Sequence, residues 1–282
     1  MNPSRHRARA YREAIRAVAD SLGPAARETL LLEHPDKHLE EVALLDRLLP
    51  QGGRLLDVGG GLGVNLACLA ALRPDVAGVL VDRFSEYDGE NRMGAAEDAF
   101  PLLRDRGVEV HAMDFWPDAR LPFGDGAFQV ATLLDVVEHL PGSPLDLLRE
   151  IHRVLAPGGR LILSGPNAAK LTSRLKLLAG KHPHIPFEAW VEGPYYSHYR
   201  EYTPDEYASL LERAGFLVEE THRSLGPWWS RARHRYWRGR RSALSPVTWA
   251  VWGVALVQFV VPPVRDEVLC VGMKARLADE LR

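Results

Sequence analysis

Four glycines, at positions 59, 60, 61 and 63, follow an apolar run in the segment LLDVGGGLG (55–63). Because Gly59, Gly61 and Gly63 have no Cβ, the backbone can turn tightly there and a ligand can approach it closely. Asp82 ends the next apolar run, 19 residues after Gly63. A carboxylate at that place can accept hydrogen bonds from both hydroxyls of a ribose. The spacing therefore predicts a binding site for a cofactor that carries a nucleoside.

Two common nucleotide-binding loops do not match the residues that follow the glycines. A nicotinamide fingerprint, G-x-G-x-x-G, would start at Gly59 and require glycine at position 64, where the chain has Val64. The loop continues as Val64-Asn65-Leu66 and so lacks the lysine of a P-loop. A nicotinamide-dependent oxidoreductase therefore remains only as a disfavoured alternative.

The elements that must position this loop follow from the periodicity of the apolar residues. Short apolar runs cover 54–60, 76–82, 108–114, 128–136 and 159–166, with helical patterns between them at 63–73, 94–106 and 143–155. Strands that alternate with helices predict right-handed βαβ units and a mostly parallel sheet covered on both faces. In such a sheet the carboxyl ends of the strands meet at one edge, where ligands bind. We therefore expect the glycine loop and Asp82 to lie at that edge.

The regular alternation stops after Asn167 and returns in the C-terminal part of the chain. Thr203 is typical of a helix N-cap, because Pro204 follows at the first helical position and Glu206 completes a capping box. Strand patterns cover 216–222 and 267–275. The organisation that we expect is an N-terminal helical segment over 1–49, a cofactor-binding core over 50–167, a lid or substrate-binding insertion over 168–203, and the C-terminal part of the fold over 204–282.

The order of these motifs resembles that of class I S-adenosylmethionine-dependent methyltransferases, in particular the small-molecule branch that includes ubiquinone-type enzymes. The glycine loop resembles the D-x-G-x-G-x-G turn of that family. Other segments that resemble the family are LPFGDGAFQVATLLDVVEHL (121–140), LLREIHRVLAPGGRLILSGPN (147–167) and HYREYTPDEYASLLERAGFLVEE (198–220). Gln129 departs from the pattern, since the family commonly carries Asp there. The resemblance implies a Rossmann-like α/β fold with a seven-stranded, mostly parallel sheet whose last strand is antiparallel, and S-adenosylmethionine as the cofactor.

The resemblance also implies which residues hold the cofactor. In the family, an acid at the position of Asp114 bonds the adenine amino group, and the next backbone N–H, here that of Phe115, meets a ring nitrogen. The cofactor-binding residues that we expect are Asp57, Gly59, Gly61, Gly63, Asp82, Arg83, Asp114, Phe115 and Asp135.

Methyl transfer from a sulfonium needs few protein groups, chiefly a base that removes the proton of an alcohol acceptor. His139 is the first candidate, because it follows the fourth predicted strand and some sugar methyltransferases that this segment resembles use a histidine there; a histidine that only packs in the loop is the alternative. His198 is the second candidate, in a stretch of polar aromatics that suits a lid over a small-molecule pocket. The residues that we expect to contact the substrate are Glu138, Tyr195, Tyr199 and Arg200. We expect no metal site, because His182 and His184 have no carboxylate or cysteine near them in the sequence.

The charge balance argues against a general nucleic-acid-binding surface, and we expect no nucleic acid as a partner. The chain has 35 basic and 37 acidic residues, for a net charge of −2. Its two cysteines, Cys68 and Cys270, cannot form a disulfide framework, and the Arg-rich start MNPSRHRARAYR does not have the pattern of a signal peptide. These features predict a cytoplasmic protein.

An unusual insert lies between the last two predicted strands, at 224–264. Seven arginines between Arg223 and Arg241 are interleaved with tryptophan and tyrosine, and the 23 residues over 242–264 carry no charge. A single membrane span is disfavoured, because the strand after the insert must return to the sheet. Two interpretations remain open: a peripheral membrane anchor with tryptophans at the lipid boundary, or burial within the domain or in a homodimer interface.

Together these patterns predict a methyltransferase that acts on a small-molecule or lipid-linked acceptor, at a hydroxyl. A protein that binds the cofactor but has lost the transfer chemistry is the alternative from a different functional class.

Overall fold

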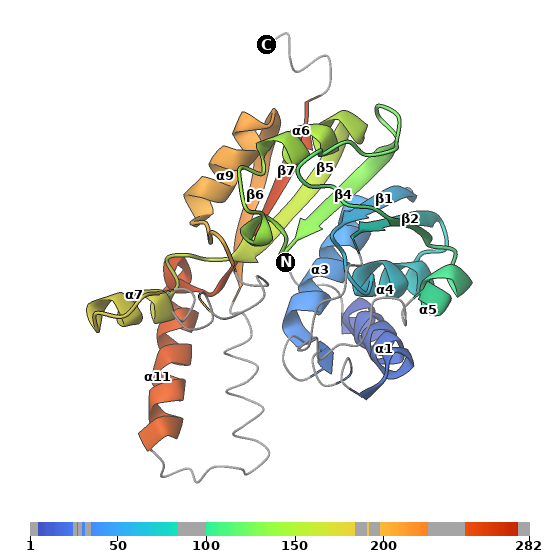
Figure 1. The fold of residues 1–282 in the computed structure, drawn as a ribbon. Helices are drawn as coiled ribbons and strands as arrows, with labels where there is room; N and C mark the ends of the chain where they lie inside the picture. The colour runs from blue at the N-terminus through green and yellow to red at the C-terminus, as the bar shows by residue number, and fades with distance from the viewer. Residues whose placement is uncertain are drawn as a thin grey trace.

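The computed structural model describes residues 5–24, 27, 30–31, 35–83, 100–183, 191, 198–224 and 246–275. Within these residues, seven strands form one sheet in the order β3-β2-β1-β4-β5-β7-β6. The strands are β1 (Gly53–Val58), β2 (Val76–Asp82), β3 (Glu109–Ala112), β4 (Phe128–Leu134), β5 (Leu155–Pro166), β6 (Phe216–Ser224) and β7 (Glu267–Lys274). Neighbours pair in parallel except β7, which runs antiparallel to both β5 and β6. This topology confirms the predicted fold class (Figure 1).

Two hydrophobic cores lie on opposite faces of the sheet, because successive strand residues point to opposite sides. Leu55 of β1 packs into one core with α1 (Arg5–Leu22), α3 (Pro35–Leu48), α4 (Val64–Leu72) and α5 (Phe100–Asp105). Leu56, the next residue, packs into the other core with α6 (Leu145–Val154) and α9 (Pro204–Arg213). The sheet is thus covered on both faces, as the alternation of strands and helices predicts (Figure 1).

Polar contacts tie the N-terminal helices to the rest of the fold. The hydroxyl of Tyr11 donates to one carboxylate oxygen of Asp46 at 2.6 Å, and Arg73 donates to the other at 2.5 Å. Arg47 of α3 forms a bidentate pair with Glu220 of β6, at 2.7 and 2.8 Å. These contacts fix α3, whose first turn lies at the carboxyl ends of the strands.

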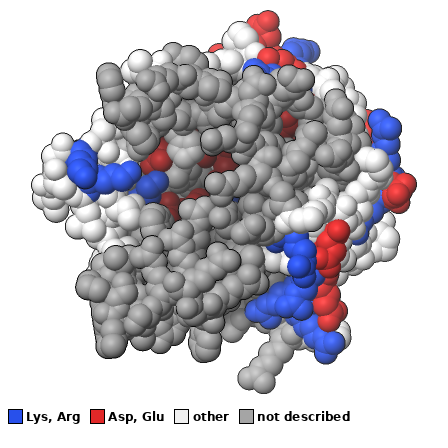
Figure 2. Space-filling view, turned by 60° about the horizontal axis from the view of Figure 1, so that its bottom comes forward, with Lys and Arg blue, Asp and Glu red and all other residues white. Residues whose placement is uncertain are grey.

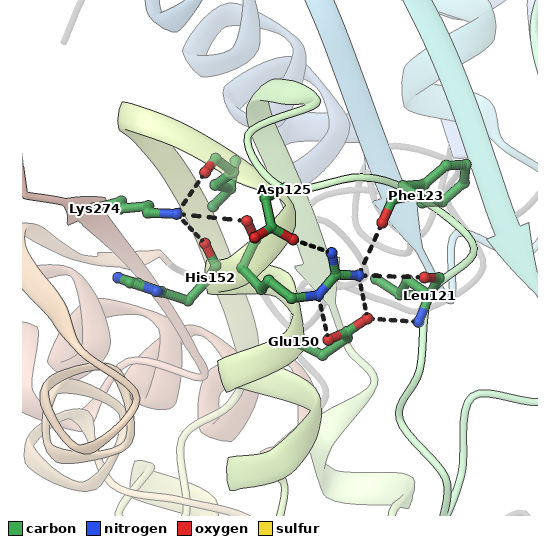
Figure 3. Close-up of polar contacts among 8 residues, drawn as sticks. Leu121, Phe123, Asp125, Glu150, His152 and Lys274 are labelled. Atoms are coloured by element: carbon green, nitrogen blue, oxygen red, sulfur yellow. Dashed lines mark hydrogen bonds and ion pairs between the residues drawn. The ribbon is translucent and has the colours of Figure 1, made fainter.

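A second group of polar contacts lies at the opposite end of the sheet, at the amino ends of the parallel strands (Figure 3). Arg153 of α6 donates to Glu150 at 2.6 Å and to Asp125 at 2.5 Å. Lys274, at the end of β7, donates to the carbonyl oxygen of His152 at 2.9 Å and so caps the C-terminal end of α6. Because these charged groups are engaged in holding α6 to its neighbours, this edge has a structural role.

The predicted lid over 168–203 contains a helix, α7 (Leu171–Leu178), which was not assigned from the sequence. Helices were recognised there by a buried apolar stripe, which α7 lacks. Leu175, Leu177 and Leu178 are all exposed, and the buried residue of the helix is Ser173.

The uncharged part of the insert at 224–264 contains α11 (Pro246–Val260) and the short 3₁₀ helix η4 (Pro262–Val264), after which β7 returns to the sheet. Residues 225–245, which include most of the Arg/Trp run, lie outside the described residues. Among the helices that the structure describes, none is both long enough and apolar enough to cross a membrane.

Candidate active site at the carboxyl ends of the strands

The glycine loop joins β1 to α4, and its three alternating glycines are all left-handed. Their φ angles are 72° at Gly59, 53° at Gly61 and 62° at Gly63. A Cβ at Gly59 would lie 2.5 Å from a methyl carbon of Val136, and one at Gly63 would lie 2.9 Å from a methyl carbon of Leu103. Two of these glycines are therefore required by close packing as well as by backbone conformation.

Gly61 differs from its neighbours because the space above it is open. A Cβ built on Gly61 meets no atom of the described residues within 4 Å. The backbone N–H of Gly61 donates to a carboxylate oxygen of Asp82 at 2.8 Å. The middle of the loop therefore combines an accessible backbone with a carboxylate at the end of the neighbouring strand, which is the arrangement that the sequence analysis predicts for a nucleoside-containing cofactor.

Asp57 lies beneath the loop, where its carboxyl accepts a hydrogen bond from the hydroxyl of Thr132 at 2.7 Å. A Cβ on Gly60 would come within 2.2 Å of the same carboxyl group, so the loop backbone packs directly on Asp57. Burial raises the pKa of Asp57 to about 7, against the opposing effect of the Thr132 hydrogen bond. Asp57 therefore lies where it supports the loop from below. Its contact with the cofactor remains a prediction.

Asp114 and Phe115 follow β3 and reach the same edge. One Asp114 oxygen accepts a hydrogen bond from the backbone N–H of Trp116 at 3.0 Å, and the other lies 3.8 Å from the Arg83 guanidinium. Phe115 is buried, and its ring edge lies 3.5 Å from the Cβ position of Gly59. The structure thus brings the predicted adenine and ribose contacts to the ends of adjacent strands.

A cation that the sequence analysis did not consider lies at this edge. Lys37, in the first turn of α3, donates to Asp135 and lies 3.4 Å from a carboxylate oxygen of Glu267. Burial by itself lowers the pKa of Lys37, but the charges of Asp135 and Glu267 outweigh it, so the pKa lies well above its ordinary value. Asp135 has a φ of 54°, which is uncommon for a residue with a side chain. Lys37 is 98 residues from Asp135 and 230 from Glu267, so no local pattern signals the contact.

The two candidate histidines meet just after β4. The short 3₁₀ helix η3 (Val137–His139) follows that strand, and its Glu138 carbonyl accepts hydrogen bonds from the backbone N–H groups of Tyr199 at 2.7 Å and Arg200 at 3.3 Å. These bonds hold the C-terminal end of the predicted lid against η3. As a result, the His139 and His198 rings lie edge to face with centroids 4.8 Å apart.

His198 is oriented by a chain of charged groups. Its Nδ1 atom lies 2.9 Å from Glu201, whose carboxylate is buried and accepts hydrogen bonds from Lys170 at 3.0 and 3.1 Å. Since Glu201 is paired with a lysine, its carboxylate is the acceptor and Nδ1 of His198 is the donor. The Nε2 atom of His198 is then left as the basic nitrogen of the ring.

The side chain of Glu138 is 1% exposed. Burial, together with the nearby charge of Asp135, raises the pKa of Glu138 well above its ordinary value. Its Oε2 atom has no hydrogen-bond partner within the described part of the chain. Glu138, His139 and His198 each place one potential ligand atom within 4.8 Å of the others.

The other residues predicted to contact the substrate lie outside the group formed by Glu138, His139 and His198. Tyr199 is exposed. The Arg200 guanidinium lies 2.7 Å from Glu206 and packs over the Tyr202 ring, with 5.2 Å to the ring centroid. Tyr195 lies outside the described residues. The substrate roles of these three residues remain predictions.

Several acidic side chains lie at this end of the sheet. Figure 2 brings forward the side toward which β4 points in Figure 1, and acidic atoms are visible near its centre. The acidic residues that the contacts place along this edge are Asp82, Asp114, Asp135, Glu138 and Glu267. Lys37 and Arg83 lie among these carboxylates and offset part of their negative charge.

Comparison with known proteins agrees with this geometry. The methyltransferase domain family matches residues 33–221. A ubiquinone biosynthesis O-methyltransferase from Xanthomonas axonopodis pv. citri is 29% identical over 190 residues, which cover 66% of this chain and 72% of that protein. A demethylspheroidene O-methyltransferase from Rhodobacter capsulatus is 30% identical over 185 residues, which cover 62% of this chain and 39% of that protein.

The fold is also similar to solved structures. Haemonchus contortus phosphoethanolamine N-methyltransferase 2, in complex with phosphomonomethylethanolamine and S-adenosylhomocysteine, has a TM-score of 0.56 at 16% identity and covers 94% of this chain and 60% of its own. The cyclase SpnF has a TM-score of 0.52 at 19% identity, with 84% of this chain and 81% of its own covered. Since these neighbours differ in activity, they establish the fold alone. The family match spans the glycine loop, Asp82 and both histidines, and the chain therefore belongs to the methyltransferase domain family and is a class I S-adenosylmethionine-dependent methyltransferase.

Proposed function

We propose that this chain transfers the methyl group of S-adenosylmethionine to a hydroxyl oxygen of a small or lipid-linked acceptor, which binds beside His139 and His198. The observation that carries the proposal is the pairing of two imidazoles, 4.8 Å apart, directly after the strand that adjoins the glycine loop. Val136, three residues before His139, packs against Gly59 of that loop. The histidines are therefore close to the place where the cofactor is expected.

The residues around the loop fit this cofactor. Asp82 and Asp114 would accept hydrogen bonds from the ribose and the adenine, and the open space over Gly61 admits a ligand close to the backbone. When bound, S-adenosylmethionine supplies a methyl group on a sulfonium sulfur, which leaves as a neutral thioether. The Asp82 carboxylate, at the end of β2 beside the loop, has the charge that complements a sulfonium.

A hydroxyl acceptor is favoured over an amine by the paired imidazoles. A neutral amine can attack a methyl group without first losing a proton, whereas a hydroxyl reacts faster when a base takes its proton. The basic Nε2 atom of His198 and the ring of His139 are groups that can take it. The curated relatives from Xanthomonas and Rhodobacter are both named as O-methyltransferases, which supports the same acceptor atom.

The experiment that tests the proposal incubates the purified chain with S-adenosylmethionine and a panel of phenols, alcohols and amines, and follows S-adenosylhomocysteine and the methylated product by mass spectrometry. We expect methylation of hydroxyl compounds. His139→Ala and His198→Ala should each lower turnover about 10²- to 10⁴-fold, the usual contribution of proton transfer, without changing the cofactor Kd. His222→Ala is the matched control, because His222 is an exposed histidine of β6 that also pairs with a carboxylate.

Methylation of amines alone would contradict the proposal. If cofactor binding were normal but no acceptor in the panel led to S-adenosylhomocysteine, the result would favour the alternative, a protein that binds the cofactor without transferring its methyl group.

A lipid-linked acceptor is supported by two helices that extend away from the sheet (Figure 1). Leu178 of α7 is 85% exposed, and Phe259 and Val260 of α11 are also exposed. Lys176, on α7, adds a positive charge beside the exposed leucines. Exposed apolar side chains next to a cation suit contact with an anionic lipid surface.

Co-sedimentation with vesicles tests this part of the proposal. We expect more protein to sediment with anionic than with neutral phosphatidylcholine vesicles, and less at high salt. Leu178→Glu combined with Phe259→Glu should reduce the bound fraction. Leu217→Glu, which charges an exposed leucine on β6, is the control and should bind like the wild type. Equal sedimentation with both kinds of vesicle would leave a soluble acceptor as the better proposal.

A further inference from the structure

We propose that Glu138, His139 and His198 bind a divalent transition-metal cation such as Mn²⁺ or Zn²⁺, with open coordination positions on the acceptor side of the active site. The proposal rests on the proposed function for the acceptor hydroxyl, but binding of the ion can be measured without any acceptor. The expectation of no metal site considered only His182 and His184, which are neighbours in the sequence. The proposed ligands come together only through the fold.

The geometry of the three residues suits one ion. Each offers one ligand atom, and these atoms all lie within 4.8 Å of one another. Metal–nitrogen and metal–oxygen bonds of about 2.0–2.2 Å place ligand atoms roughly 3–3.5 Å apart. Side-chain rotations that bring the ligand atoms about 1–2 Å closer together are therefore sufficient. His139 and Glu138 are adjacent in η3, and the backbone hydrogen bonds to the Glu138 carbonyl fix the segment that carries His198.

The buried carboxyl of Glu138 is the second observation that points to a ligand. A carboxyl oxygen that is removed from water without a hydrogen bond destabilises the folded state. Oε2 of Glu138 is such an atom among the described residues, and the side chain is almost completely buried. A divalent cation would supply the missing partner and the compensating charge. Lys37 is the cation whose charge acts on the Glu138 carboxyl, and it is already bonded to Asp135 and Glu267.

The contacts of His198 have the form that metal-binding histidines take. Such histidines usually donate their second ring N–H to a carboxylate, which fixes the tautomer and orients the ring. Nδ1 of His198 lies 2.9 Å from the buried carboxylate of Glu201, which Lys170 holds in turn. Nε2 is then the atom available to the metal. A histidine that served only to pack would not need this buried, charged support.

The ligand set indicates which cations would bind. Two imidazoles and one carboxylate favour Zn²⁺, Mn²⁺ or Fe²⁺ over Mg²⁺ and Ca²⁺, which prefer oxygen ligands. Three protein ligands leave positions for water or for an acceptor oxygen. A hydroxyl bound to the cation has a lowered pKa and can release its proton to water, so the oxygen is ready to form a bond to the methyl carbon. The histidines would then act as ligands rather than as the base.

The experiment uses the full chain after treatment with EDTA and dialysis. Titration calorimetry with MnCl₂ or ZnCl₂ alone, supported by electron paramagnetic resonance of bound Mn²⁺, should show one site per chain. Glu138→Gln and His198→Gln should each raise the metal Kd at least tenfold. Glu201→Gln should raise it about 10- to 100-fold by loosening the His198 ring. His222→Gln is the control and should bind like the wild type. Circular dichroism spectra check that each variant is folded, and His198→Gln provides the test if Glu138→Gln is not.

The possible outcomes separate this proposal from the proposed function. An absence of stoichiometric uptake by the wild type, or equal affinity in all the variants, would overturn the metal site. If the EDTA-treated chain also methylates hydroxyls at the full rate, the proposed function stands and the histidines act without a metal. If one ion binds with the expected variant pattern but only amines are methylated, the metal site stands and the proposed hydroxyl acceptor fails.

Discussion

The substitution Gly61→Ala tests directly whether the cofactor lies against the glycine loop. Gly61 has a φ of 53°, and a Cβ there meets no atom of the described residues within 4 Å. The added methyl group therefore has two separable effects. It strains the backbone of the protein, and it occupies the space in which we expect the cofactor to lie.

The backbone effect can be matched by a control. A residue with a Cβ in the left-handed region costs about 1–2 kcal/mol relative to glycine. Gly107, after α5, has a φ of 72° and also has nothing within 4 Å of an added Cβ. Gly61→Ala and Gly107→Ala should therefore lower the free energy of unfolding by similar amounts. For a chain of this size the Tm of each variant should fall by roughly 2–4 °C per kcal/mol.

The effect on the cofactor should appear only at Gly61. A methyl group forced into an occupied contact typically costs about 1–3 kcal/mol. At 1.4 kcal/mol for each tenfold change, the Kd should rise roughly 5- to 150-fold. Titration calorimetry with S-adenosylmethionine and S-adenosylhomocysteine would measure the affinity, and urea unfolding would measure the stability.

The comparison of the two variants is the decisive result. If Gly61→Ala and Gly107→Ala bind the cofactor equally well, the cofactor does not approach Gly61 and the loop serves only as a turn. If Gly61→Ala destabilises the protein far more than Gly107→Ala, the space above Gly61 is filled by the protein itself and the structural premise is wrong.

Three further predictions concern charged groups. Asp82→Ala should weaken cofactor binding by about 1.5–3 kcal/mol in calorimetry, the scale of lost charge-assisted hydrogen bonds, and unchanged affinity would remove Asp82 from the site. Arg47 holds the pKa of Glu220 down to about 2, from its ordinary 4.5, so the stability from this pair is complete above about pH 4.5 and is lost as the pH falls toward 2. Arg47→Gln should therefore cost about 1 kcal/mol at neutral pH and less in acid, and an equal loss of urea stability at pH 7 and pH 3 would contradict this. Burial raises the pKa of Asp57 from 3.8 to about 7, so the folded state binds the extra proton and stability falls as the pH rises from about 4 to 7. In thermal unfolding between pH 5 and 8, the Tm of Asp57→Asn should rise relative to that of the wild type as the pH increases. A constant difference in Tm between the two proteins would refute the raised pKa of Asp57.

Local sequence patterns predict the sheet and the cofactor edge well. The strand pattern at 76–82 coincides with β2, and Asp82 stands at its end beside the glycine loop. The capping box of Thr203 and Glu206 forms as predicted at the start of α9. These features are accessible because a strand, a cap or a tight turn depends on residues that are close together in the chain.

The arrangement of the catalytic side of the site could not be predicted in the same way. His139 and His198 were separate candidates, and their contact depends on hydrogen bonds from Tyr199 and Arg200 to the Glu138 carbonyl. α7 was missed because its leucines face solvent and leave no buried stripe. The family resemblance identifies the cofactor but carries little information on the acceptor, since folds of this kind serve different activities.

The sequence by itself determined the α/β class, the order of the motifs along the chain, and the carboxylate and glycines that we expect to face the cofactor. The reason is that the periodicity of apolar residues and the conformational freedom of glycine act locally. Only the tertiary structure decided that Lys37 meets Asp135 and Glu267, and that Glu138 and two histidines 59 residues apart place ligand atoms within 4.8 Å of one another. The physical reason is that such contacts arise when the packing of both faces of the sheet brings remote segments together at its edge. Burial of these groups then shifts their pKa values and so changes their charge. No local sequence pattern indicates either change.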